Sequence, residues 1–401
     1  MPLPPPLSPA PTEGGAHAPG APPAPGPEER ARSERLARLI RAEIEAAGGA
    51  VAFARFMELA LYAPGLGYYC APRRIFGDRG DFTTAPELGS LFARCLARQC
   101  HEVLAELGGG DILEAGAGSG AMAADLLLEI EALNGLPDNY MVLELSAELR
   151  ARQKETMERK AAHLLNRVRW LDDIPAPGFR GVMLANELLD AMPVQRFRLG
   201  DRGPMLLQVG WDGSGFAWRE KPAPPELRAR LDSLSLPEGY TSEIGPAAEA
   251  WIKGAAERLA AGVLLLIDYG FPRAEFYHPQ RAGGTLMCHY RHQAHDDPLI
   301  LVGLQDITAH VDFTAVAEAA AGAGLSVLGY TTQAAFVLAF APALVAGSDP
   351  RAARRHLELT TQIKKLTLPH EMGELFKVIA LGRGVERSLS GFALVDQRVR
   401  L

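Results

Sequence analysis

Three glycines at alternate positions mark the first segment of the chain that could do chemistry. Residues 111–122 read D-I-L-E-A-G-A-G-S-G-A-M, a short apolar run and an acid followed by Gly116, Gly118 and Gly120. Glycine has no Cβ, so the backbone of such a turn can approach a ligand closely, and a helix that follows the turn offers unpaired N–H groups. The pattern predicts a nucleotide-like ligand lying against the main chain.

Glu114 indicates which of two classes of ligand, a dinucleotide or S-adenosylmethionine, this turn holds. The string from Gly116 to Ala121 also satisfies the dinucleotide pattern G-x-G-x-x-A, which is a weak signal by itself. A carboxylate at the strand end repels a pyrophosphate but attracts the cationic amino-acid end of S-adenosylmethionine. Glu144 closes the next strand and could accept both ribose hydroxyls, with a solvated strand-end acid as the alternative. The sequence therefore predicts S-adenosylmethionine as the cofactor.

Polar residues also follow the next two predicted strands. Asp172 could meet the adenine amino group, or it could be a plain loop residue. Asn186, Glu187 and Asp190 follow the fourth strand, where open α/β sheets bind ligands. A guanidinium arrives protonated, and paired carboxylates fit its planar fork. We expect these three residues to serve catalysis on a cationic acceptor; the alternative is that Asp190 caps a helix.

The segments that must position these residues alternate between strand and helix. Short apolar runs occur at 112–115, 140–145, 168–171, 181–186 and 263–269. This alternation predicts an α/β fold with a parallel sheet covered by helices on both faces. The remaining expected elements are helices at 28–47, 51–62, 86–107 and 313–323, and strands at 326–331 and 375–381.

Composition changes divide the chain into segments. We expect a disordered Pro/Ala-rich tail (1–27), an N-terminal helical and lid region (28–110), a catalytic domain (111–385) and a C-terminal tail (386–401). Within the catalytic domain we expect an antiparallel hairpin insertion at about 194–221 and a helical region at 333–366. The first tail has neither the apolar block nor the arginines of a targeting segment, so we expect a cytoplasmic location.

Composition also excludes some classes of function. A net charge of -7 argues against nucleic acid as the main partner. The best apolar run, 334–347, is too short to span a membrane and contains Pro342, so no membrane insertion is expected. His289, His292 and His295 lie on no helix or cysteine motif that would bring them together, so we expect no metal site.

Seven further segments carry a resemblance to a known family. They are LYAPGLGYY (61–69), FGDRGDFTTAPEL (76–88), EAGAGSG (114–120), NELLDAMPV (186–194), IDYG (267–270), GTLMCHYRH (284–292) and DITAHVDF (306–313). With these segments, in this order over about residues 30–385, the chain resembles the MidA-like family. The mitochondrial members of that family are arginine methyltransferases that assist complex I assembly.

The resemblance implies a class I methyltransferase fold, a Rossmann-like seven-stranded sheet with its last strand antiparallel. It also implies methyl transfer from S-adenosylmethionine to an arginine of a protein partner, in mitochondrial members a respiratory complex I subunit. The family motif is matched at Gly116, Gly118, Gly120, Glu144, Asn186, Glu187 and Asp190. In the segment 77–86, Asp81 or Thr83 could contact the cofactor from a lid, and Met287 stands where a basic residue is expected.

Other functions remain compatible with the sequence. A small-molecule methyltransferase would share the cofactor site, because the acceptor pocket cannot be drawn from the sequence. A non-catalytic assembly factor that binds S-adenosylmethionine would keep the glycine turn without needing Glu187 or Asp190. A dinucleotide-dependent oxidoreductase is disfavoured by Glu114.

Overall fold

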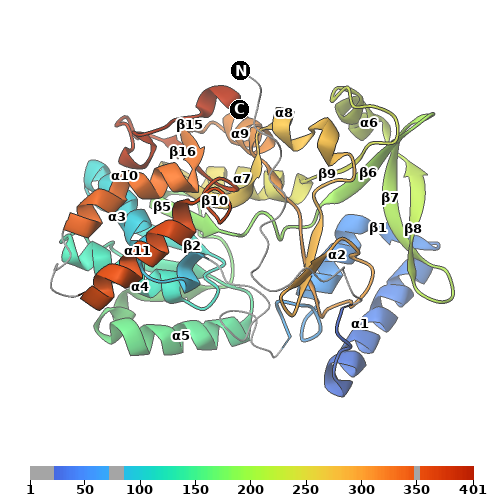
Figure 1. Ribbon diagram of the computed structural model, residues 1–401, viewed down its shortest axis with the longest axis horizontal. Coiled ribbons are helices and arrows are strands. Elements are labelled where there is room, and N and C mark those ends of the chain that lie inside the picture. Colours follow the sequence, from blue (N-terminus) through green and yellow to red (C-terminus); the bar gives the residue numbers. More distant parts are fainter. Residues whose placement is uncertain (1–21, 72–84, 347–352) are drawn as a thin grey trace.

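The computed structural model of the protein describes residues 22–71, 85–346 and 353–401. Most of the expected N-terminal tail lies outside these residues, as do the lid candidates Asp81 and Thr83. The described chain forms two side-by-side parts: a large α/β part with a broad sheet, and a smaller part made mainly of antiparallel strands (Figure 1).

The main sheet has the topology that the sequence predicts. Its strands lie in the order β15 (Ser326–Thr332), β16 (Phe376–Arg383), β10 (Leu259–Phe271), β5 (Phe179–Asn186), β2 (Asp111–Ala115), β3 (Tyr140–Leu143) and β4 (Val168–Leu171). The pairs from β10 to β4 are parallel, whereas β16 runs antiparallel to both of its neighbours. The short strand β14 (Val311–Asp312) adds to β10 in parallel. The expected Rossmann-like sheet with an antiparallel last strand is confirmed.

Helices bury both faces of this sheet. One face packs against α3 (Leu91–Leu107), α4 (Ala121–Ala132) and α10 (Gln333–Ala346), and the opposite face packs against α7 (Pro246–Arg258) and α9 (Phe313–Gly322). On the first face α5 (Ala147–Ala161) packs beside α4, and α11 (Ala353–Thr367) packs beside α10 and α3 (Figure 1). The expected helical region at 333–366 thus covers the sheet.

The smaller part is built around a second sheet. Its antiparallel strands are β1 (Ala50–Ala52), β6 (Gln195–Gly200), β7 (Gly203–Trp211), β8 (Phe216–Pro222) and β9 (Thr241–Ile244). Helices α1 (Pro27–Ala46) and α2 (Phe53–Tyr62) pack beside it, together with a small sheet of β11 (Met287–Tyr290), β12 (Gln293–His295) and β13 (Asp306–Thr308). The hairpin expected at 194–221 is present, but β9 from a later segment pairs with β6, and β1 from an earlier segment pairs with β7.

Two expected boundaries differ from the structure. The helix predicted from Pro86 begins at Leu91, because Gly89 has a φ of +143° and separates it from a short 3₁₀ turn at Ala85–Glu87. The segment 386–401, expected as a tail, is packed onto the domain. Phe392 is buried with its ring centroid 5.8 Å from that of Phe336, and so its apolar area is removed from water.

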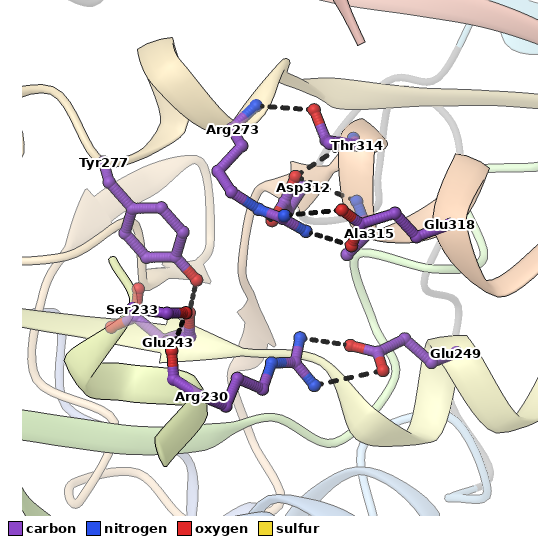
Figure 2. Close-up of polar contacts among 10 residues, drawn as sticks. All are labelled: Arg230, Ser233, Glu243, Glu249, Arg273, Tyr277, Asp312, Thr314, Ala315 and Glu318. Carbon is purple, nitrogen blue, oxygen red and sulfur yellow. Dashed lines mark hydrogen bonds and ion pairs between the residues drawn. The ribbon is translucent and has the colours of Figure 1, made fainter. Parts of the chain in front are cut away.

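Polar side chains connect the two parts where α6 (Pro225–Asp232) and β9 approach the main domain (Figure 2). Arg230 of α6 forms two hydrogen bonds, of 3.1 and 2.6 Å, with the Glu249 carboxylate of α7. Arg273 reaches both Glu318 and Asp312, while the Tyr277 hydroxyl donates to the backbone carbonyl of Glu243 in β9. The contacts of Arg230 and Tyr277 join the smaller part to the larger one, whereas those of Arg273 lie within the larger part.

No helix among the described residues is long and apolar enough to cross a membrane.

The centre of the main sheet allows a sharp test. A Cβ on Gly181 in β5 would lie 1.9 Å from the backbone oxygen of Asp111 in β2, so Gly181→Ala must push the two strands apart. We expect it to lower the free energy of unfolding by more than about 2 kcal/mol. A Cβ on Gly254 in α7 would meet only open space, and Gly254→Ala should be neutral or stabilise by up to about 1 kcal/mol. Urea unfolding of both variants checks this; equal stability of the two would contradict it.

Candidate functional site

The predicted glycine turn connects β2 to α4 in the conformation that glycine allows. Gly116, Gly118 and Gly120 have φ values of +71°, +52° and +79°, in the left-handed region that residues with a Cβ disfavour. A Cβ on Gly120 would also lie 3.0 Å from the Cα of Gln153. The turn therefore presents bare backbone at the carboxyl edge of the sheet, next to the first turn of α4.

Glu114 lies buried directly before this turn. The Tyr140 hydroxyl donates a 2.5 Å hydrogen bond to its Oε2, while Oε1 has no partner among the described residues. Burial raises the pKa of Glu114 to about 7, against the lowering effect of the Tyr140 hydrogen bond. A buried acceptor atom with no partner next to a glycine turn fits a cationic group such as the ammonium of an amino acid.

Glu144 follows β3 and is fixed by neighbours on α5. Its Oε1 accepts from the Ser146 backbone N–H at 2.9 Å and its Oε2 from the Gln153 side-chain amide at 3.0 Å. Gln153 also donates to the Gly118 carbonyl at 3.1 Å and accepts from the Trp170 indole at 2.9 Å. Sequence reasoning missed Gln153, because nothing in its own helix indicates that it joins the acid to the glycine turn.

Asp172 lies at the edge of the site. Its side chain is 93% exposed and pairs with Arg150 at 2.8 Å, although it still lines the cavity described below. A contact between Asp172 and an adenine stays a prediction.

The polar residues after β5 form a turn held by β10. Glu187 has a φ of +51°, which is uncommon for a residue with a side chain, and its N–H donates to the Ile267 carbonyl at 2.9 Å. Asp268 completes the hold, since its Oδ2 accepts from the backbone N–H groups of Leu189 and Asp190 at 2.9 and 3.2 Å. The Asn186 amide donates to Glu187 Oε1 at 3.0 Å. The three predicted residues are thus brought together on one rigid turn.

The carboxyl groups of this turn lie close to one another, with Asp190 and Asp268 buried and Glu187 partly buried. Burial, and then the charge of Asp190, raise the pKa of Glu187 to about 8, and burial raises the pKa of Asp190 to about 6. The pKa of Asp268 is also raised by burial and by both neighbours. In the described part of the chain neither Glu187 nor Asp190 pairs with a lysine or arginine, and Asp190 Oδ1 and Asn186 Oδ1 are buried acceptors without a partner. This is a site suited to a cation.

Aromatic side chains wall this side of the site. Tyr62 and Tyr69 stack with ring centroids 5.5 Å apart, and the Tyr62 hydroxyl donates to the Ala191 carbonyl at 2.9 Å. Tyr269 hydrogen-bonds to the Asp190 side chain, and its ring meets that of His310 edge-on at 5.3 Å. The segment 61–69, which sequence analysis assigned to no chemistry, and the segment 306–313 therefore contribute walls to the site.

One cavity of about 1500 Å³ joins the two groups of residues. Its lining includes the predicted residues Glu114, Gly116, Gly118, Glu144, Asp172, Asn186, Glu187 and Asp190. Ligand pockets for a single drug-sized molecule are commonly about 300–1,000 Å³, so this cavity can hold a cofactor together with an acceptor. Its lining comes from both parts of the molecule, because Arg55 and Glu58 of α2 also contribute.

The described residues contain no cluster of three or more His, Cys, Asp or Glu side chains that could hold a metal ion. His289 lines the cavity, whereas His292 is exposed.

The buried carboxyl group of Glu187 has a consequence for stability. A carboxyl group with a raised folded-state pKa contributes stability that is complete below its unfolded pKa, near 4.5, and is lost as the pH rises through about 8. Glu187→Gln is neutral at every pH, so its melting temperature should exceed that of the wild type increasingly from pH 5 to pH 8, by about 3 °C or more at the upper end. Exposed Glu257 provides the control variant Glu257→Gln. A difference that does not change with pH would contradict the assignment.

Solved structures resemble the whole chain. A crystal structure from Burkholderia thailandensis, bound to S-adenosyl-homocysteine, is 47% identical, covers 94% of this chain and 100% of its own, and superposes with a TM-score of 0.91. A native crystal structure of an uncharacterized protein from the same organism is 46% identical with the same coverage and a TM-score of 0.89. The first of these structures holds the product form of the cofactor that the sequence predicts.

Curated relatives match over most of their length. The mitochondrial protein arginine methyltransferase NDUFAF7 of Mus musculus is 28% identical over 374 residues, which is 83% of this chain and 81% of that protein. The Danio rerio protein of the same name is 27% identical and covers 84% of each chain.

A protein-family model matches residues 95–331, from α3 to β15. The family is described as "Putative S-adenosyl-L-methionine-dependent methyltransferase". The matched range contains the glycine turn, Glu144 and the Glu187 turn, and the unpartnered Oε1 of Glu114 fits the cofactor's ammonium. The chain therefore belongs to this family and is an S-adenosylmethionine-dependent methyltransferase.

Proposed function

We propose that the protein transfers a methyl group to an arginine side chain of a protein substrate, with a subunit of respiratory complex I as the suspected substrate. The observation that supports this most is the neighbouring carboxyl groups of partly buried Glu187 and buried Asp190, which line the cofactor cavity and have no cation partner among the described residues. The relatives from Mus musculus and Danio rerio are protein arginine methyltransferases, which supports the same acceptor.

The residues of the first half of the cavity would hold the cofactor. Glu114 would receive the ammonium, the turn Gly116–Gly120 would lie against the ligand, and Glu144 would accept from the ribose hydroxyls. S-adenosylmethionine supplies a methyl group on a positively charged sulfur. Because Glu144 is already fixed by Ser146 and Gln153, it needs no rearrangement to bind.

Glu187 and Asp190 would orient and polarise the acceptor. A guanidinium keeps its proton in solution, and two carboxylates can hold its N–H groups from one edge. When the positive charge of the guanidinium is localised on the nitrogens next to these carboxylates, the other terminal nitrogen keeps electron density. That nitrogen can then attack the methyl group of the cofactor. Methylation then releases one proton, and the raised pKa values of Glu187 and Asp190 make either group a suitable acceptor for it.

The stacked tyrosines keep water from this reaction. Removal from water raises the pKa of the Tyr62 and Tyr69 hydroxyls, and the Tyr269 hydroxyl is already engaged with Asp190. Positioning of the acceptor in such an enclosed site supplies much of the acceleration of a displacement reaction.

The carboxylates can be tested by amide substitution. Glu187→Gln and Asp190→Asn should each lower methylation of arginine peptides by about 100-fold or more, since a positioned acid–base group contributes about 10²–10⁴-fold. Binding of S-adenosylhomocysteine, measured by calorimetry, should remain within about twofold of the wild type. Labelled cofactor and mass spectrometry of tryptic peptides identify the product, with Glu257→Gln as the control. Label found only in small metabolites, or full activity of Glu187→Gln, would overturn the proposal.

The cofactor half has its own test. Glu144→Gln exchanges an acceptor carboxylate for an amide that can accept through one atom only, so S-adenosylhomocysteine should bind about 10-fold more weakly or worse. Asp172→Asn removes an exposed carboxylate at the cavity edge and should change the affinity by less than about threefold. Calorimetry measures both. If the two variants bind equally well, Glu144 does not hold the ribose.

A further inference from the structure

A third carboxylate faces the acceptor half of the cavity from the smaller part of the molecule. Asp306 begins β13, is 3% exposed, and lines the same cavity as Glu187 and Asp190. The Tyr69 hydroxyl donates to its Oδ1 at 2.9 Å. Sequence analysis placed Asp306 in a family-like segment and gave it no role.

Asp306 stands on a support that is separate from the main sheet. β13 pairs with β11, where Asp306 is opposite His289, and the neighbouring Ile307 is buried in the core formed with α1 and α2. Glu187 and Asp190, by contrast, follow β5 of the main sheet. The carboxylates therefore reach the cavity from two different elements, one in each part of the molecule.

The groups are close enough to influence one another. The charge of Asp306 contributes to the raised pKa of Glu187 and to the raised pKa values of Tyr62 and Tyr69. Burying the like charges of Glu187 and Asp190 next to each other is unfavourable unless a counter-charge arrives. The partnerless buried acceptors Asp190 Oδ1 and Asn186 Oδ1 independently indicate that a hydrogen-bond donor belongs in this space.

We propose that Asp306 is an acceptor-binding residue, which holds the substrate's guanidinium from the side opposite Glu187 and Asp190. Tyr69 is its positioning residue. This inference rests on the proposed arginine substrate and adds how that side chain is recognised: the guanidinium lies between the two parts of the molecule, beside the stacked rings of Tyr62 and Tyr69.

This arrangement selects arginine over lysine. A guanidinium carries five donors on a planar fork, so it can reach carboxylates on both of its edges at once. An ammonium is compact and its three donors spread from one atom, so it cannot span two walls in the same way. Discrimination between the two acceptors should therefore depend on Asp306.

Three variants separate recognition from folding and from cofactor binding. Asp306→Asn should raise the KM for an arginine peptide by about 10-fold or more, as expected for loss of a charged hydrogen bond, and should reduce the preference for arginine over a lysine peptide. Tyr69→Phe should raise KM by about threefold to 10-fold through loss of one neutral hydrogen bond. Exposed Asp296, directly after β12 of the small sheet, supplies the control Asp296→Asn, which should behave as wild type. S-adenosylhomocysteine affinity should be unchanged in all three.

The outcomes distinguish this inference from the proposed function. If the wild type methylates no arginine peptide or protein, the proposed function fails. If the wild type is active and Asp306→Asn keeps its KM and its selectivity, only the role of Asp306 fails. Should Asp306→Asn lose cofactor binding as well, Tyr69→Phe decides: a raised KM with normal cofactor affinity supports the inference, and an unchanged KM overturns it.

Discussion

Buried carboxyl groups of like charge, placed where β5 and β10 end, are the constraint on which the site depends. Parallel pairing puts Asn186 beside Ile267, and the carboxylate of Asp268 then accepts the backbone N–H groups that hold Asp190 in place. Burial of such groups without a counter-charge lowers stability, and proteins keep strained, like-charged sites where function needs them. The positive φ of Glu187 is a second feature of this turn that lowers stability and is kept for the site.

The smaller part of the molecule completes the cavity that the carboxyl edge of the main sheet lines on one side. A parallel sheet offers ligands only the crevice outside its carboxyl ends, so it supplies one wall. α2, the small sheet and the tyrosines of the 61–69 segment supply further lining of the cavity, and the polar contacts of Arg230 and Tyr277 join the two parts (Figure 2). The residues around the glycine turn and those around Glu187 thereby line one continuous cavity.

Several elements could be predicted because their signals are local. The helix at 28–47 and the strands of the main sheet follow from apolar periodicity, which depends on neighbours in the chain. The predicted start of α3 was wrong by five residues. Pro86 is favourable in a first helical turn, but Gly89 interrupts the helix between Pro86 and Leu91. The C-terminal segment was wrong as a tail, since burial of Phe392 depends on Phe336, far away in sequence.

The sequence by itself determined the kind of ligand: glycine spacing favours a turn in the left-handed conformation with bare backbone, and Glu114 and Glu144 fix the charges around it. It also placed Asn186, Glu187 and Asp190 at one strand end. Tertiary structure alone decided that Gln153 and Asp306 join them, because these side chains come from a helix and a separate sheet. Packing of distant segments brings such residues together, and their spacing in the sequence does not reveal that they are close in space.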